Sequence, residues 1–262
     1  MQNLNLLIKN LKKHPIVDAV FITGSQGDEH KKYSDIDLVI ILNKHTHDLT
    51  SLYTWIGDKF ADIFFFDHED MKRIETCNEL SGNSMDAVFV SWLQKATIQF
   101  DKSGRLTQLV KTVNELANKI KIPKSEKDLF WQKINYNFVA NTRYFESNDP
   151  IYHEALQVRL LYSMSEIFMG YFEFRNIPWR GEKNALKYIK ENDTDFYKAF
   201  IAYAQMSNLE DRFRKYSDLV KMVFTHDYKS WSMGDVLPQS KNRNNSNQVE
   251  LIKFWNELIG EL

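Results

Sequence analysis

The sequence contains a single cysteine, Cys77, in 262 residues. One cysteine cannot form an internal disulfide, nor can it supply the cysteine clusters of zinc-binding modules, and this usage is typical of a reducing cytoplasmic environment. Long apolar runs are also missing, because runs such as residues 38–42 and 63–66 are far shorter than the roughly 18 residues of a membrane span. The N-terminal segment carries its lysines after the apolar positions and lacks a small-residue cleavage site, so we expect no secretory signal.

An excess of charge of one sign is absent as well. The 34 basic and 35 acidic residues give a net charge of −1, which argues against a protein that grips nucleic-acid backbone over a wide surface. With 43% hydrophobic and 26% charged residues, the composition is that of an ordinary globular protein, and it excludes disorder, collagen and coiled coil as descriptions of the whole chain. At about 150 residues per domain, the length allows one large domain or two small ones.

Up to about residue 110, short β-branched or aromatic runs alternate with stretches at helical spacing, which is the pattern of a mixed α/β sheet. Apolar residues at helical spacing over residues 4–11 predict an amphipathic helix that ends near His14-Pro15. The apolar runs predict strands at residues 19–22, 36–42, 61–66 and 96–100. Between the second and third strands, an acidic and threonine-rich entry predicts a helix over residues 48–59. A further helix is predicted over roughly residues 69–80.

Beyond Gly104 the strand signals end and helical periodicity takes over. Residues 121–125 contain a proline and are predicted to form an interdomain hinge, because proline lacks a backbone donor and forces its neighbour out of helical geometry. Helices are predicted over residues 126–146, 151–175, 181–191, 195–205, 208–226 and 248–260. The expected organisation is therefore an α+β (mixed α/β) domain at residues 1–120, followed by an all-α helical bundle domain at residues 126–262.

The segment most informative about chemistry joins two predicted strands. The first strand ends at Gly24 and Ser25, nine residues follow, and Asp35 and Asp37 open the next apolar strand. Residues i and i+2 of a strand point to the same face, so the two carboxylates lie side by side. A shared divalent cation relieves their repulsion, and hard oxygen ligands favour Mg²⁺. Gly24 permits a tight turn, and the Ser25 hydroxyl with nearby N–H groups can cradle phosphate oxygens.

A third aspartate, Asp62, lies inside the apolar run of residues 61–66. Burying a carboxylate there is costly unless a positive charge compensates, and a metal ion shared with Asp35 and Asp37 would do so. Three carboxylates from neighbouring strands are a suitable donor set for a two-metal phosphoryl-transfer site. We therefore predict all three aspartates as metal ligands and as catalytic residues.

Two other acidic segments have structural explanations. Residues 67–70 (Asp-His-Glu-Asp) follow the third predicted strand, and they are expected to cap the next helix with an acidic first turn rather than to bind a metal. Asp101 directly precedes a Lys-Ser-Gly sequence and is expected to be a turn residue.

Gly24-Ser25, the nine-residue gap, Asp35-Ile36-Asp37 and the later Asp62 resemble the signature of the nucleotidyltransferase superfamily that includes DNA polymerase beta. The resemblance is greatest to bacterial aminoglycoside and lincosamide nucleotidyltransferases, in which a helical bundle also follows an α/β domain. The motif itself covers residues 21–66, and the general layout extends the resemblance to the whole chain.

This resemblance implies Mg²⁺-dependent transfer of a nucleoside monophosphate, with ATP as the expected donor, to a hydroxyl of a small molecule such as an antibiotic, with release of pyrophosphate. Asp35 and Asp37 would hold magnesium on the triphosphate. Asp62 would complete a second metal site or act on the attacking hydroxyl. Gly24 and Ser25 would receive the β- and γ-phosphates.

The resemblance also implies that the helical domain supplies a basic residue to the triphosphate. A helix beginning near Gly181 offers free N–H groups with Arg180 and Lys183 at its positive end, which is a natural phosphate site. Lys183 and Arg180 are therefore the candidate nucleotide-binding residues of this domain.

The general base is less defined. Several aminoglycoside-modifying relatives supply a glutamate from the early helices of the second domain, but the matching residues 131–145 contain asparagines and no acid. Glu146, Glu154 and Glu166 remain as alternatives, and this departure puts an aminoglycoside acceptor in doubt.

Two other functions stay open at this point. One is an antitoxin-like or regulatory protein that binds or nucleotidylates a protein partner, although a large helical domain favours the small-molecule enzyme. The other is an inactive domain that only binds nucleotide, because a fold does not guarantee activity.

Overall fold

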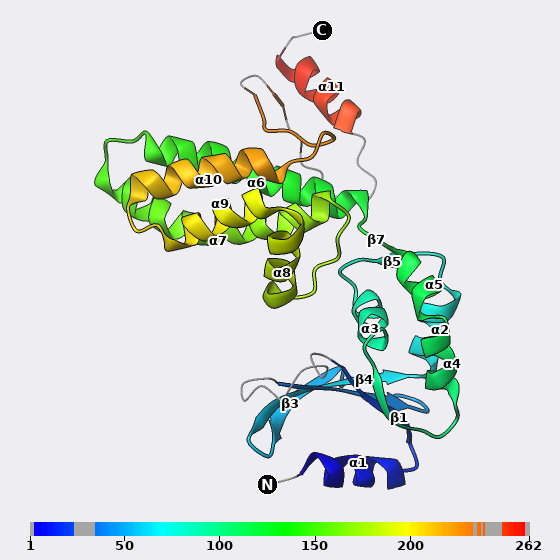
Figure 1. The fold of residues 1–262 in the computed structure, drawn as a ribbon. Coiled ribbons are helices and arrows are strands. Elements are labelled where there is room, and N and C mark those ends of the chain that lie inside the picture. The colour runs from blue at the N-terminus through cyan, green and yellow to red at the C-terminus, as the bar shows by residue number, and fades with distance from the viewer. Residues whose placement is uncertain (1–2, 24–34, 233–234, 237, 239–247, 260–262) are drawn as a thin grey trace. The chain divides into compact units, whose positions relative to one another are not determined.

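The computed structural model describes residues 3–23, 35–232, 235–236, 238 and 248–259 (Figure 1). The chain forms two compact units, Met1–Lys121 and Ile122–Leu262, each with its own buried core. Among the described residues, no helix combines the length and the apolar character needed to cross a membrane.

The first unit combines strands and helices. In chain order its elements are α1 (Leu4–Lys13), β1 (Val17–Thr23), β2 (Ile36–Leu42), β3 (Ser51–Ile56), β4 (Lys59–Asp67), α2 (His68–Thr76), β5 (Leu80–Ser81), α3 (Met85–Leu93), β6 (Thr97–Asp101), α4 (Arg105–Lys111), α5 (Val113–Asn118) and β7 (Ile120–Lys121). In the described part of this unit, the main sheet has the strand order β3-β4-β2-β1-β6. Its neighbours pair antiparallel, except that β2 and β4 run parallel.

The two faces of this sheet are covered differently. On one face, alternate residues of β1, β2 and β4 form a core with the apolar residues of α1. On the other face, the intervening residues of the same strands pack against α2, α3, α4 and α5. Figure 1 shows α1 on one side of the sheet and α3 on the other. This sandwich arrangement explains why β1 and β2 are buried along nearly their whole length.

The prediction of a helix over residues 48–59 is wrong, because this segment forms β3 and the start of β4. The two strands are joined by Gly57 and Asp58, and Gly57 adopts φ of 68°. A two-residue turn that starts with a positive φ is the preferred link between antiparallel strands. The acidic and threonine-rich entry at residues 47–50 resembles a helix cap, whereas Tyr53 and Trp55 alternate on one face of the strand.

Other boundaries differ by smaller amounts. The helix predicted over roughly 69–80 is shorter, because α2 ends at Thr76 and Leu80 already belongs to β5. In the described residues beyond Gly104, one short strand occurs: β7 pairs in parallel with β5, so the expectation that strands end there is also wrong. Two residues per strand carry too little pattern to be recognised in a sequence.

The second unit is helical among its described residues. Its elements are α6 (Lys124–Phe145), α7 (Pro150–Phe174), α8 (Glu182–Asn192), α9 (Thr194–Gln205), α10 (Leu209–Val223) and α11 (Gln248–Ile259). All six helices predicted for this part of the chain are confirmed, and among the described residues their boundaries differ from the predicted ones by at most three residues. Asp149 with Pro150, Asp193 and Asn208 begin three of them with side-chain caps, as such residues commonly do.

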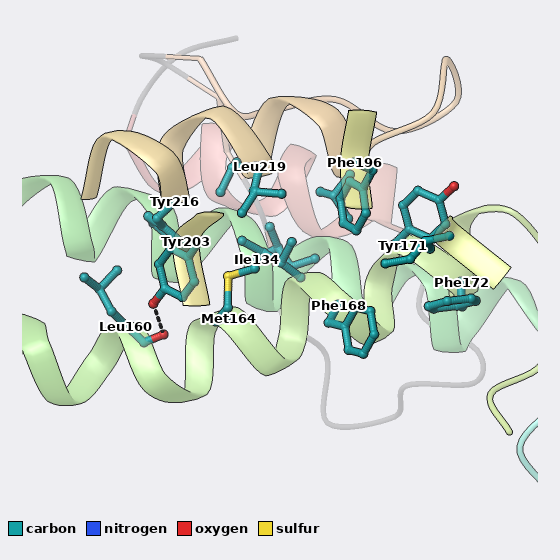
Figure 2. Packing of buried hydrophobic residues seen from close by; sticks show 14 of the residues in the cluster. Ile134, Leu160, Met164, Phe168, Tyr171, Phe172, Phe196, Tyr203, Tyr216 and Leu219 are labelled. Carbon is teal, nitrogen blue, oxygen red and sulfur yellow. Dashed lines mark hydrogen bonds between the residues drawn. The ribbon is translucent and has the colours of Figure 1, made fainter. Parts of the chain in front are cut away.

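The core of this unit is rich in aromatic rings, some of which are drawn in Figure 2. Phe196 of α9 packs on Tyr171 of α7 with ring centroids 4.2 Å apart. The buried Tyr203 hydroxyl donates a hydrogen bond of 2.8 Å to the Leu160 carbonyl, which satisfies its polar atom inside the bundle. Most of the aromatic content of the chain's second half therefore has a packing role.

Candidate functional site

The sheet of the first unit places Asp37 and Asp62 directly opposite each other. They are register partners on the parallel strands β2 and β4, and Thr23 of β1 is the partner of Asp37 on its other side. Register partners lie on the same face of a sheet, and neighbouring strands are about 4.8 Å apart. Both predicted aspartates therefore project from one face.

Asp35 precedes the first residue of β2 and is exposed, whereas Asp62 is half-buried. Burial, with a further contribution from the negative charge of Asp35, raises the pKa of the Asp62 carboxyl above its ordinary value. Within the described residues, Asp62 Oδ1 is shielded from solvent and has no hydrogen-bond partner. A buried carboxylate oxygen without a partner is costly, so this atom is suited to receive a cation or a hydroxyl donor.

The donor set of Asp35, Asp37 and Asp62 consists of hard carboxylate oxygens, which suits Mg²⁺. In the described part of the chain, no three acidic, histidine or cysteine side chains are already gathered closely enough to hold a metal ion.

The other half of the predicted motif, Gly24 and Ser25, lies outside the described residues. The last described residue of β1 is Thr23, which is buried and donates a hydrogen bond of 3.1 Å from its hydroxyl to the Trp92 carbonyl of α3. This bond connects the end of β1 to helix α3, on the sheet face from which the aspartates project.

Arg180 and Lys183 belong to the second unit. Gly181 has φ of 81° and precedes the first residue of α8, as the sequence predicts. Lys183 is exposed on the first turn of this helix. Arg180 is half-buried, its Nη1 donates a hydrogen bond of 2.6 Å to the Trp179 carbonyl, and burial lowers its pKa.

The three glutamates considered as bases differ in their surroundings. Glu146 and Glu154 are exposed, whereas Glu166 of α7 is half-buried and accepts a hydrogen bond from Asn137 Nδ2. Burial raises the pKa of Glu166, and the Asn137 hydrogen bond and the charges of Lys133 and Arg159 partly offset this effect.

The asparagines of α6 have a structural role that the sequence did not reveal. Arg159 of α7 donates from Nε to Asn141 at 2.7 Å and from Nη2 to Asn137 at 2.8 Å. Asn141 in turn donates to the Ser163 hydroxyl at 3.1 Å. A spacing of four residues places both asparagines on one face of the helix, and this pattern is the signal that could have predicted the network.

The other acidic clusters behave as expected. Asp67 accepts hydrogen bonds from the backbone of Glu69 and Asp70, and Asp70 accepts one from the Asp67 backbone, which completes a capping box. Asp101 accepts hydrogen bonds from the backbone of Gly104 and Thr107, so it fixes the turn before α4. Neither cluster is needed to explain the chemistry of the sheet.

Sequence reasoning missed Tyr53. It is the register partner of Asp62 on β3, so it lies on the same face as the aspartates, and 61% of its surface is exposed. The glycine-containing turn of residues 57–58 between two short aromatic runs is the signal that could have found this strand.

Residues 4–130 match the family model of the nucleotidyltransferase domain. A nucleotidyltransferase-like protein from Exiguobacterium sibiricum 255-15 is similar in structure with a TM-score of 0.45, at 13% identity, over 84% of this chain and 72% of that chain. No curated protein matches the chain. Residues 4–130, which contain all three aspartates, therefore form a domain of the nucleotidyltransferase superfamily.

Proposed function

We propose that this protein is a magnesium-dependent enzyme that transfers a nucleoside monophosphate, preferably AMP from ATP, to a hydroxyl of a small acceptor. The observation that carries this proposal is the placement of Asp37 and Asp62 as register partners on one sheet face, inside a nucleotidyltransferase domain. Asp35 lies near enough to Asp62 to raise the pKa of that carboxyl.

Asp35, Asp37 and Asp62 would hold the divalent cation. When bound, such a cation neutralises charge on a triphosphate and stabilises the charge that develops as the phosphoryl group is transferred. The unpartnered Asp62 Oδ1 supports this assignment, because a cation would satisfy an oxygen that the described residues leave without a partner.

Asp62 is also the residue best suited to orient the acceptor. In the transfer, the acceptor oxygen forms a bond to the α-phosphorus, the bond between the α-phosphorus and its bridging oxygen to the β-phosphate breaks, and pyrophosphate leaves. The acceptor hydroxyl loses its proton to a carboxylate or to water. A half-buried carboxylate with a raised pKa is a better proton acceptor than an exposed one.

The remaining nucleotide contacts are assigned by position in the sequence. Gly24 and Ser25 are proposed to bind the β- and γ-phosphates, since they follow Thr23 in the sequence and Thr23 is the register partner of Asp37. Lys183 and Arg180 of the second unit are proposed as further phosphate ligands, because they flank the N-terminal end of α8.

The proposal is tested by pyrophosphate release from ATP and Mg²⁺ in the presence of a broad panel of hydroxylated antibiotics and metabolites. Wild type should release pyrophosphate with at least one acceptor, and Asp37→Asn should reduce the rate by about 10²-fold or more at preserved fold. Asp48→Asn is the matched control, because it removes the same charge from an exposed position between β2 and β3. Absence of pyrophosphate release by wild type across the panel would contradict transfer to a small acceptor.

A further inference from the structure

Three aromatic side chains are exposed together on the hairpin formed by β3 and β4. The exposed fractions are 61% for Tyr53, 65% for Trp55 and 41% for Phe60. Phe60 contacts both of the others: its ring is parallel to that of Tyr53 with centroids 6.5 Å apart, and Trp55 meets it edge-on at 5.6 Å. We call Tyr53, Trp55 and Phe60 the aromatic platform.

The platform lies on the same sheet face as the aspartates. Trp55 is the register partner of Phe60, and Tyr53 is the register partner of Asp62, which is in turn opposite Asp37. Adjacent strands are about 4.8 Å apart, so the Tyr53 backbone is one strand spacing from that of Asp62.

The helical layer that covers this face does not cover the platform. Farther along β4, Phe64 packs on Trp92 with ring centroids 4.4 Å apart, and Phe66 packs on Phe89 at 4.3 Å. Both partners belong to α3, and Phe66 is buried whereas Phe60 is exposed. The described part of the first unit thus leaves three large rings open to solvent beside the acidic site. Two of them, Tyr53 and Trp55, are on the edge strand β3, where exposed apolar surface invites association.

We propose that the aromatic platform binds the acceptor by stacking against a flat apolar ring, with the ring's hydroxyl directed at Asp62. This inference rests on the proposed function. In the sheet order, β1 lies on one side of the Asp37–Asp62 pair, and β3 with Tyr53 and Trp55 lies on the other side. The proposed phosphate ligands Gly24 and Ser25 follow β1 in the sequence. The side of the platform is therefore assigned to the acceptor rather than to the nucleotide.

The geometry also limits the acceptor's chemistry. A ring stacked on Tyr53 or Trp55 must carry its hydroxyl within about one to two strand spacings, roughly 5–10 Å, to reach Asp62. Aromatic faces stack on flat apolar surfaces whether these are aromatic or the C–H face of a sugar. We therefore expect a compact ring-bearing alcohol rather than a flexible chain.

The test measures dissociation constants for a panel of hydroxylated compounds in matched phenyl and methyl forms, such as phenyl and methyl β-glucosides and glycerol ethers. Binding is measured by calorimetry in the presence of Mg²⁺ and a non-hydrolysable ATP analogue. Wild type should bind the phenyl member of at least one pair about tenfold more tightly than the methyl member. Trp55→Ala should remove this preference, Tyr53→Ala should reduce it, and Trp55→Phe should retain most of it.

Leu52→Ala is the matched control, because Leu52 is 43% exposed on the same strand but points to the opposite face. Absence of a phenyl preference in wild type, or an equal loss in Leu52→Ala and Trp55→Ala, would overturn the proposal. The proposal would also be overturned if analytical ultracentrifugation showed that wild type is a dimer and that Trp55→Ala is a monomer. Binding of the ATP analogue is measured separately for each variant, so that failure of the nucleotide site is distinguished from failure of the platform.

Discussion

Asp37 and Asp62 are register partners on two parallel strands, so their carboxylates leave the sheet from the same face and from adjacent positions. Antiparallel pairing of the same strands would have brought different residues opposite each other. The parallel pairing of β2 with β4 is therefore the feature of the fold that turns two separate sequence positions into one acidic site.

An acidic site of this kind should reduce the stability of the ligand-free protein. Burial and the Asp35 charge raise the pKa of Asp62 in the folded state, so ionised Asp62 opposes folding at neutral pH. We expect Asp62→Asn to raise the free energy of unfolding at pH 7 by less than about 1 kcal/mol, because solvent screens a half-exposed group. Catalytic turnover by Asp62→Asn should nevertheless be lost, because replacing a functional residue that lowers stability commonly costs activity.

The pH dependence of the stability gained in Asp62→Asn is the control for this prediction. A raised folded-state pKa means that stability falls as pH rises through that value, so the advantage of Asp62→Asn should disappear below the ordinary carboxyl pKa of about 4. Thermal unfolding of wild type and Asp62→Asn at pH 7 and at pH 3.5 measures the stability difference at each pH. A variant that is less stable than wild type at pH 7 would show that Asp62 is satisfied in the folded protein.

Asp18 should have the opposite pH dependence. Burial raises its pKa, but hydrogen bonds from Ser103 at 2.6 Å and His68 at 2.9 Å, with the charge of His68, outweigh this and lower the pKa overall. A lowered folded-state pKa contributes stability above the unfolded value of about 4, and this contribution is lost as pH falls through the folded value. Asp18→Asn should lower the free energy of unfolding by about 1–3 kcal/mol at pH 7. On the acid limb of the profile, where stability falls with decreasing pH, the variant should lose stability less steeply than wild type.

Urea unfolding of wild type and Asp18→Asn between pH 2.5 and pH 7 measures this difference. Asp48→Asn is again the control, because its exposed carboxyl should leave the profile unchanged. An acid limb that is equally steep in wild type and Asp18→Asn would contradict a stabilising role for this buried carboxylate.

Arg159 should stabilise the second unit through the two asparagines of α6. Its guanidinium is held by Asn137 and Asn141, and it lies 5.2 Å from the centre of the Tyr144 ring. Arg159→Met leaves both asparagine oxygens without this donor, which should cost about 2–3 kcal/mol. Arg143→Met, at an exposed position of α6, should change the free energy of unfolding by less than about 0.5 kcal/mol. Equal effects of the two substitutions in urea unfolding would contradict the network's importance.

Gly170 should be required for the close contact of α6 with α7. A Cβ at this position would lie 2.7 Å from Ile134 Cδ1, which belongs to a fully buried side chain. Overpacking costs about 1–3 kcal/mol and should outweigh the helix-propensity gain of about 1 kcal/mol, so Gly170→Ala should destabilise the protein.

A double-mutant cycle isolates this contact. Ile134→Val deletes the Cδ1 atom, so the Gly170→Ala substitution should cost less, or even stabilise, in the Ile134→Val background. Additive effects of the two substitutions in thermal unfolding would show that the crowding is not between these two residues.

Much of the first unit's sheet could be predicted, because its buried strands are apolar runs with few alternatives. Asp35, Asp37 and Asp62 could be singled out for the same reason: a carboxylate within an apolar strand needs an explanation. The edge strand β3 could not, since the acidic and threonine-rich residues before it favour a helix, and its pairing with β4 is what fixes its conformation.

Contacts between segments that are distant in the sequence could not be predicted either. The Asp18–His68 and Asp18–Ser103 hydrogen bonds join residues 50 and 85 positions apart, and no local pattern marks them. By contrast, the long helices of the second unit carry their periodicity over many turns, which is why they could be predicted closely.

We propose that the three aspartates bind a divalent cation together with a nucleoside triphosphate. The most direct test is calorimetric titration of the protein with ATP, in Mg²⁺ and after removal of divalent ions with EDTA. We predict saturable binding that requires Mg²⁺, a loss of about tenfold or more in affinity for Asp37→Asn, and unchanged affinity for Asp48→Asn. Equal ATP affinity in wild type and Asp37→Asn, or ATP affinity that is the same with and without Mg²⁺, would contradict cation binding by these aspartates.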